Sequence, residues 1–99
     1  QIYRLGSLKI NTSDLRACYR GEIIELTLTE MRIMKFLIRE YPHLSTREEI
    51  NQEVWPNQKV MPTTLNTHLS NLRSKFPDWE YEILNIKGKG VQLVLKNLV

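Results

Sequence analysis

Two helix-start signals in the middle of the chain limit its fold more than any other feature. The segments 27–30 (TLTE) and 46–49 (TREE) each place a threonine three residues before a glutamate. This spacing is that of a capping box, in which each side chain accepts a hydrogen bond from the backbone N–H of the other residue. Pro42 lies between the two motifs and stops the first helix. The sequence therefore predicts two short, separate helices in this region.

Apolar spacing and proline positions complete a set of three helices. The first helix has an apolar stripe made of Met31, Met34, Leu37, Ile38 and Tyr41. The second helix ends at Trp55-Pro56, where Trp55 is expected to belong to the core. Pro62 suits the first turn of a helix, and Pro77 follows the last turn of the same segment. A third helix is therefore predicted from Pro62 to about Lys75.

Residues 1–26 are predicted to form a small antiparallel sheet. Apolar residues alternate with polar ones in short runs, separated by turn formers at Gly6-Ser7, at 11–14 (NTSD) and at Gly21. A sheet of this size is only marginally stable alone in water. We therefore expect its apolar face to pack against another layer.

Residues 81–95 are predicted to form a β-hairpin. The alternating apolar residues that indicate it are Leu84 and Ile86 in the first strand and Val91, Leu93 and Leu95 in the second. The segment 87–90 (KGKG) forms its tip, because glycine adopts the positive φ that tight turns need. Lys87 and Lys89 would carry positive charge to the end of a projecting ribbon. Trp79, just before the hairpin, is expected to cover the sheet.

Strands, three helices and a hairpin, in this order, are the elements of a winged helix-turn-helix, an α+β fold. A chain of 99 residues suits one domain. We divide the domain 1–99 into an N-terminal sheet (1–26), a helical part (27–75) and a hairpin wing (81–95).

Composition excludes several other classes. Hydrophobic residues make up 41% of the chain and charged residues 25%, which are ordinary globular values. No apolar run approaches the ~20 residues of a membrane span. With Cys18 as the only cysteine and two histidines far apart, we expect no disulfide, no metal site, no cofactor and a cytoplasmic location. Cys18 is expected to be an inert, packed thiol. The net charge of +3 permits a polyanionic partner without requiring one.

The third helix has an unusual exposed face. At 100° per residue, its buried stripe consists of Leu65, Leu69, Leu72 and Phe76. The opposite side consists of Thr63, Thr67, Ser70 and Ser74, flanked by Asn66 and Asn71. These residue types lower helix propensity, so a merely solvated helix would favour longer charged side chains. Short polar side chains let a helix backbone approach the major groove of DNA, where asparagine can pair with adenine and a threonine methyl can contact thymine. Arg73 and Lys75 lie farther along, where we expect contact with phosphate.

Other functions remain open on these residues alone. The same uncharged helix face could contact a partner protein, for example RNA polymerase. RNA binding would favour stacking aromatic side chains, which this face lacks. A basic stripe joining Arg73, Lys75, Lys87 and Lys89 on one side of the fold would favour nucleic acid over protein. The chain offers no catalytic triad, phosphate-cradling loop or metal-ligand spacing, so we do not expect an enzyme.

Several segments together closely resemble the DNA-binding effector domain of OmpR/PhoB-type response regulators. They are 26–30 (LTLTE), 47–50 (REEI), 54–55 (VW), 64–75 (TLNTHLSNLRSK) and 86–90 (IKGKG). The resemblance covers essentially all 99 residues. It implies a four-stranded N-terminal sheet, a three-helix core and a hairpin wing, in a domain that controls transcription by binding double-stranded DNA. It also implies a phosphoacceptor receiver domain upstream, and Gln1 in place of an initiator Met agrees with a fragment or processed chain.

The resemblance also implies roles for individual residues. Base reading is implied for Asn66, Thr67, Ser70 and Asn71. Contact with DNA phosphates is expected for Thr63, Thr64, His68, Arg73 and Lys75. Wing contact with the DNA backbone or minor groove is implied for Lys87 and Lys89. Contact with RNA polymerase is implied for the loop residues Pro56, Asn57, Gln58 and Lys59. Two copies on tandem half-sites, about one helical turn apart, are expected from the family, with a monomer in the absence of DNA.

The chain departs from the family pattern at informative positions. The family often has arginine at the positions of Thr63 and Asn71, an aspartate at Asn66, and RGxGY at 87–91, where this chain has KGKGV. Arginine pairs with guanine in a forked geometry that asparagine and lysine cannot copy. We therefore expect a shift toward A·T-rich sites at the base pair facing Asn71. His68 lies at the edge of the buried stripe, so a phosphate contact and a partly buried niche both remain open.

Overall fold

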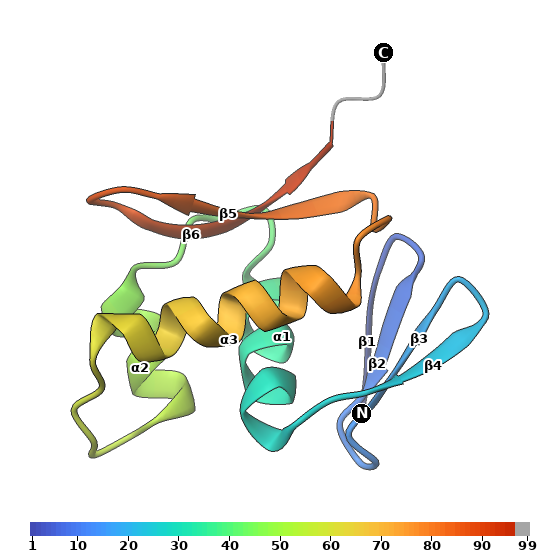
Figure 1. The fold of residues 1–99 in the computed structure, drawn as a ribbon, viewed down its shortest axis with the longest axis horizontal. Helices are drawn as coiled ribbons and strands as arrows, with labels where there is room; N and C mark the ends of the chain where they lie inside the picture. Colours follow the sequence, from blue (N-terminus) through green and yellow to red (C-terminus); the bar gives the residue numbers. More distant parts are fainter. Residues whose placement is uncertain (97–99) are drawn as a thin grey trace.

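Four short strands begin the chain and form one antiparallel sheet in sequence order (Figure 1). The structure is a computed structural model that describes residues 1–96. They are β1 (Ile2–Leu5), β2 (Leu8–Asn11), β3 (Arg16–Tyr19) and β4 (Glu22–Glu25). Alternation buries Leu8 and Ile10 of β2 and Ala17 and Tyr19 of β3 on the side that joins the core. The predicted sheet is confirmed. Residues 97–99 of the predicted domain lie outside the described part.

Three helices follow: α1 (Leu28–Glu40), α2 (Arg47–Val54) and α3 (Pro62–Lys75). Both predicted capping boxes form, Thr27 with Glu30 and Thr46 with Glu49. α1 ends directly before Tyr41-Pro42, and Pro62 occupies the first turn of α3. The local signals therefore set the boundaries of all three helices as predicted.

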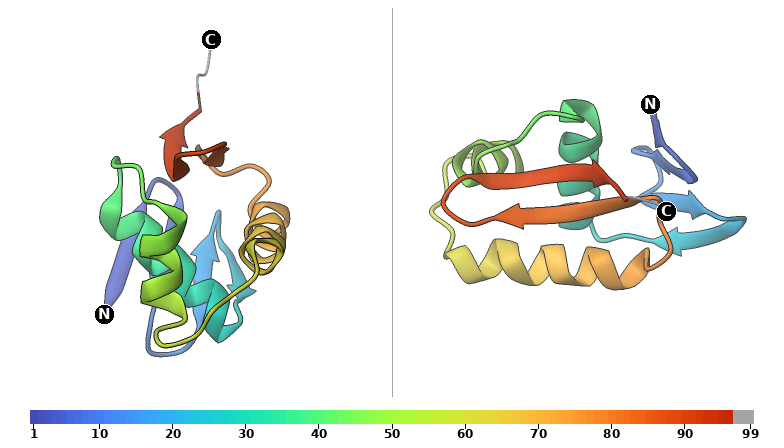
Figure 2. Two further views of the ribbon diagram at one scale, coloured as in Figure 1. Left: turned by 90° about the vertical axis from the view of Figure 1, so that its left-hand side faces the viewer. Right: turned by 90° about the horizontal axis from the view of Figure 1, so that it is seen from above.

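Strands β5 (Tyr81–Ile86) and β6 (Gly90–Leu95) form the predicted hairpin, which runs beside α3 (Figure 2). Only some of the apolar residues that indicated the hairpin lie on its inner face. Ile83 is 4% exposed and faces the core, whereas Leu84 is 37% exposed. Leu95 is also exposed, so only Val91 and Leu93 of the second strand are buried. The strand is apolar on both sides around Ile83, and alternation alone could not decide which side packs inward.

One core joins these layers. The buried residues of α1 and α3 belong to the same cluster as those of the N-terminal sheet and the hairpin. Trp79 is 2% exposed and its indole Nε1 donates to the carbonyl of Leu5 at 3.0 Å, so it covers the sheet as predicted. Cys18 corrects another prediction, because its side chain is exposed instead of packed. Its neighbours Ala17 and Tyr19 occupy the inner face of β3. Because successive side chains of a strand point to opposite faces, Cys18 points outward.

The winged helix-turn-helix arrangement of the α+β class is confirmed. Among residues 1–96, no group of three His, Cys, Asp or Glu side chains is placed to hold a metal ion. None of the helices described is long and apolar enough to span a membrane.

Candidate nucleic-acid interface

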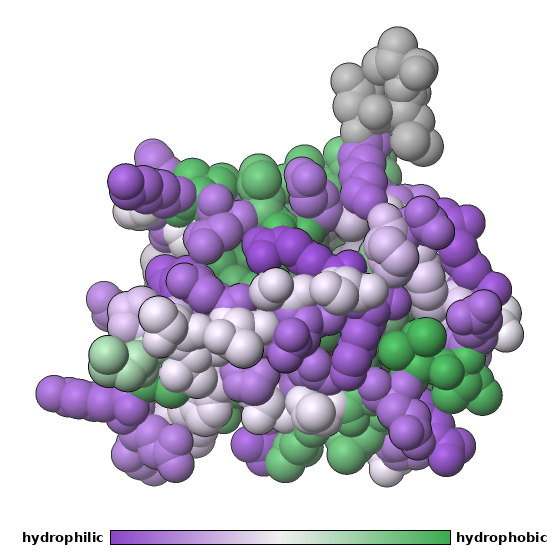
Figure 3. Space-filling model, viewed as in Figure 1, coloured by the Kyte–Doolittle hydropathy of each residue, from purple (hydrophilic) through white to green (hydrophobic). Residues whose placement is uncertain are grey.

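Helix α3 packs one side into the core and leaves the other side free. Leu65, Leu69 and Leu72 are at most 1% exposed. The residues of the opposite side are exposed, and we call them the polar face of α3: Thr63, Asn66, Thr67, Ser70, Asn71 and Ser74. In Figure 3 a pale band of nearly neutral hydropathy crosses the molecule over this helix, between strongly hydrophilic side chains. The predicted division of α3 into a buried stripe and an uncharged polar face is therefore present.

Hydroxyl groups of this face are partly used by the helix itself. The Oγ1 of Thr67 donates to the carbonyl of Thr63 at 2.9 Å, and the Oγ of Ser74 donates to the carbonyl of Ser70 at 3.2 Å. Each of these two hydroxyls therefore offers lone pairs, and Thr67 a methyl group, to a partner outside the helix. The side chains of Ser70 and Asn71 form no hydrogen bond with any other described residue, so both keep donors and acceptors free.

The wing tip lies at the same end of the molecule as the beginning of α3 (Figures 1 and 2). Lys87 and Lys89 are both exposed there. The turn closes through a bond from the backbone N–H of Lys89 to the carbonyl of Ile86 at 2.9 Å. Two ammonium groups are thus held on a fixed ribbon near the first half of the polar face.

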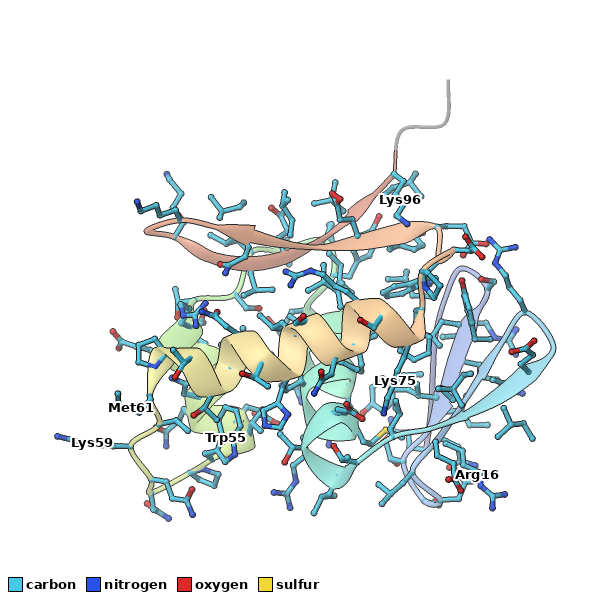
Figure 4. The ribbon with its side chains drawn as sticks, viewed as in Figure 1. Arg16, Trp55, Lys59, Met61, Lys75 and Lys96 are labelled. Carbon is cyan, nitrogen blue, oxygen red and sulfur yellow. The ribbon has the colours of Figure 1, made fainter. Side chains whose placement is uncertain are left out.

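The loop between α2 and α3 occupies this end as well. Pro56, Asn57, Gln58 and Lys59 are all exposed. Figure 4 shows Lys59 extending away from the body of the molecule, next to Met61, which is 69% exposed. The predicted partner loop is therefore accessible to another molecule.

Arg73 and Lys75 do not continue the basic surface of the wing tip. The Nε of Arg73 donates to the carbonyl of Ile83 at 3.0 Å, which ties α3 to the hairpin. Lys75 lies at the other end of α3, where its Nζ bonds the carbonyl of Glu25 at 3.1 Å and pairs with the Glu30 carboxylate (Figure 4). The four cations are therefore not joined into one stripe, and within the domain Lys75 links α3 to α1 and the sheet.

The carboxylate that Lys75 contacts is only 3% exposed. Burial raises the pKa of Glu30, but the hydrogen bond from Lys75 and the bonds from the Thr27 cap outweigh it and hold the pKa below its ordinary value. Glu30 is therefore charged at neutral pH and fixes the end of α3 to the start of α1.

Two of the expected phosphate contacts are only half exposed. Thr64 and His68 lie at the border of the buried stripe. The ring of His68 lies 5.7 Å from the ring of Trp55, centre to centre, and its Nδ1 is buried without a hydrogen-bond partner among the described residues. His68 is therefore half-buried against a tryptophan that packs on the core as predicted, and its contact with phosphate stays a prediction.

Arg47 is a polar-face neighbour that the site prediction missed. Its Nη2 donates to the carbonyl of Pro62 at 2.9 Å and to the Oδ1 of Asn66 at 2.8 Å. Arg47 is the first residue of α2, directly after the Thr46 cap. Helical spacing within α3 cannot reveal a contact that comes from another helix, so no pattern in the sequence marked it.

Negative charge gathers on a different surface. A groove between α1 and α2 is lined by Phe36, Glu40, Glu48, Glu49, Gln52 and Glu53. Arg39 pairs with Glu40 and Glu53 at 3.5 Å each, which leaves Glu48 and Glu49 without a salt bridge among the residues described. This acidic groove would repel a polyanion, in contrast to the wing tip.

Comparisons with known proteins agree with this geometry. The model of a family described as "Transcriptional regulatory protein, C terminal" matches residues 21–93. The transcriptional regulatory protein VxrB of Vibrio cholerae is 33% identical over 89 residues, which are 89% of this chain and 36% of VxrB. The chain spans about a third of the length of the curated relatives it matches.

Solved structures share the whole fold. The DNA-binding domain of CpxR from E. coli superposes with a TM-score of 0.80 at 27% identity, covering 96% of this chain and 97% of that one. The DNA-binding domain of the response regulator AdeR, solved in complex with an intercistronic region, gives a TM-score of 0.80 at 25% identity. That match covers 94% of this chain and 99% of the AdeR chain.

Proposed function

Because the chain belongs to the OmpR/PhoB-type family of response-regulator DNA-binding domains, we propose that it binds double-stranded DNA in a sequence-specific manner and so controls transcription. In this proposal α3 enters the major groove and the wing lies on the adjacent backbone or minor groove. The role is one of binding and not of catalysis. The whole regulator would act in the cytoplasm, with a receiver domain that sets when the domain binds.

The polar face of α3 is the observation that carries the proposal. It is exposed over several turns and contains no charged side chain between Thr63 and Asn71. Its hydroxyl, methyl and amide groups are short enough for the helix backbone to come close to base edges. Asn66, Thr67, Ser70 and Asn71 are proposed to read bases, because they lie on the same exposed side.

Cationic and polar side chains around this face would hold the DNA backbone. Lys87 and Lys89 project at the end where α3 begins, and Thr63, Thr64 and His68 line the same helix. Arg73 keeps its terminal guanidinium nitrogens available, since only its Nε is bound to Ile83. These contacts fix orientation and contribute salt-dependent affinity, whereas the base contacts specify the sequence.

The proposal also includes two further partners, a second copy of the chain and RNA polymerase. Two copies would bind tandem half-sites, since a single copy offers few cations to the phosphates. The exposed loop from Pro56 to Lys59 would face RNA polymerase bound next to them. Use of the polar face for protein contact is the competing function, and it predicts no DNA sequence preference.

Selection of binding sites from a pool of random duplexes tests this function. We expect the 99-residue chain to enrich one sequence motif, and Asn71→Ala to remove the preference at one base pair within it, by about 1–3 kcal/mol. That base pair is expected to be A·T and not G·C, since Asn71 stands where the family often has arginine. Gln52→Ala removes an exposed amide from the acidic groove and is expected to leave the motif unchanged.

Two other results would contradict all or part of this proposal. Absence of any enriched motif, for the chain alone and for the full-length regulator, would contradict DNA reading and favour protein contact. A motif with an essential guanine facing Asn71 would leave DNA binding in place and contradict only the A·T preference.

A further inference from the structure

The side chain of Asn66 is held by a residue of another helix, and this limits what it can read. Arg47 of α2 donates from one guanidinium nitrogen to Asn66 Oδ1 and to the carbonyl of Pro62, at 2.8 and 2.9 Å. The second bond ties the guanidinium to the first turn of α3. Arg47 is half-buried and lies within a complete capping box, in which the Thr46 hydroxyl accepts from the Glu49 N–H at 3.0 Å.

Donor and acceptor chemistry fixes the orientation of the amide. A guanidinium carries only donors, so the atom of Asn66 that faces Arg47 must be its oxygen. The NH2 group then points away from Arg47, and within residues 1–96 it has no hydrogen-bond partner. The exposed end of Asn66 therefore presents donors.

We infer that Arg47 is a positioning residue that makes Asn66 a donor-only reader of the major groove. Guanine offers two acceptors there, O6 and N7, and thymine offers O4, whereas adenine offers one acceptor, N7, beside its N6 donor, and cytosine offers only the N4 donor. Paired reading of adenine would need the Asn66 oxygen as an acceptor, and that oxygen is engaged by Arg47. Without that acceptor, the NH2 group can reach only N7 of adenine and meets the N6 donor beside it, so guanine and thymine are preferred to adenine at the base facing Asn66, and cytosine is rejected.

This inference narrows the general statement that an asparagine on this face can pair with adenine. Asn71 has no such neighbour among residues 1–96 and keeps both halves of its amide free. The two asparagines thus differ in what they read, although they are the same residue type on the same helix face. The inference rests on the proposed function, since it assigns a base preference to a residue of that site.

The test compares motifs selected from random duplexes by matched variants. Asn66→Ala identifies the base pair that Asn66 reads, as the position where its preference is lost. We expect guanine or thymine at that position with the unaltered chain, with cytosine depleted about tenfold. In Arg47→Met the amide is free to turn, and we expect the preference at this one position to flatten or move to adenine. In Arg47→Lys, which restores a donor, the original preference is expected to return.

Each outcome separates the inference from a structural role and from the proposed function. A merely structural Arg47 would lower the affinity of Arg47→Met for all sequences alike and leave the base preference unchanged, which overturns the inference. A preference for adenine or cytosine over guanine and thymine at the position facing Asn66 in the unaltered chain also overturns it. Failure of the unaltered chain to enrich any motif is a different result, because it overturns the proposed function itself. Thermal unfolding of each variant confirms that it is folded at the selection temperature.

Discussion

A single charged pair connects the end of α3 to the rest of the molecule. The Glu30 carboxylate is 3% exposed and accepts from Lys75, while the Lys75 side chain keeps 30% of its surface in contact with solvent. The same carboxylate accepts from the backbone N–H of Thr27 at 2.9 Å. One side chain therefore caps α1 and holds α3, so its charge matters for the stability of both helices.

Replacing this carboxylate should change how stability depends on pH. The pKa of Glu30 in the folded state lies below its ordinary value of 4.5. Its charged form therefore stabilises the fold fully above that value, and the stabilisation is lost as the pH falls through the lowered pKa. Glu30→Gln keeps the cap but loses the ion pair. We expect a loss of about 2 kcal/mol at pH 7 and a flatter pH dependence below about pH 5 in urea unfolding.

Glu25→Gln is the matched control for this charge change. Its side chain is exposed, and only its backbone carbonyl contacts Lys75. Stability equal to that of the unaltered chain is expected for the control. An equal loss in both variants would mean that net charge, and not the buried pair, causes the effect.

At the scale of elements, the wing depends on one close backbone contact. Ser45, before α2, pairs with Val91 of β6 through two backbone hydrogen bonds of 2.9 and 2.8 Å. Gly90 lies beside this pair with φ +150°, and a Cβ there would lie 2.1 Å from the carbonyl oxygen of Ser45. The absence of a side chain at Gly90 therefore lets the hairpin dock on the helical part.

Gly90→Ala should loosen the wing. The added methyl group cannot fit without breaking the Ser45–Val91 pairing, so we expect a loss of about 2–4 kcal/mol in thermal or urea unfolding. Gly88→Ala, at φ +77° with no atom within 4 Å of the added Cβ, is expected to cost only about 1 kcal/mol of backbone strain. Equal losses in the two variants would contradict the close-contact explanation.

At the scale of the whole molecule, charge is divided between surfaces. The wing tip carries Lys87 and Lys89, whereas the α1–α2 groove carries unpaired glutamates. If the wing tip neutralises DNA phosphates, Lys87→Ala/Lys89→Ala should weaken binding to all sequences alike. We expect the slope of log K against log salt to fall by about 2 in titrations of one selected duplex.

Lys9→Ala, on the outer face of the N-terminal sheet, removes a charge of the same kind far from the wing. It should leave the slope unchanged. An unchanged slope in the double wing variant would place the wing away from the DNA backbone.

The sequence predicted those parts of the fold that depend on neighbouring residues. Capping boxes and prolines marked the helix ends, and helical spacing separated the buried leucines of α3 from its polar face. Contacts between distant elements were not predictable in this way. Lys75 meets Glu30, and Arg47 meets Asn66, only because separate helices pack together. Cys18 was misplaced, and the buried position of Ile83 was not predicted, because each strand face is chosen by the layer it meets.

The most direct test of DNA reading by α3 is an NMR titration of the isotope-labelled chain with its selected duplex. We predict the largest changes in backbone amide shifts at residues 63–71 and 87–90, with little change at the acidic groove of α1 and α2. Largest changes at 48–53, with residues 63–71 unaffected, would contradict the claim that the polar face of α3 reads the DNA.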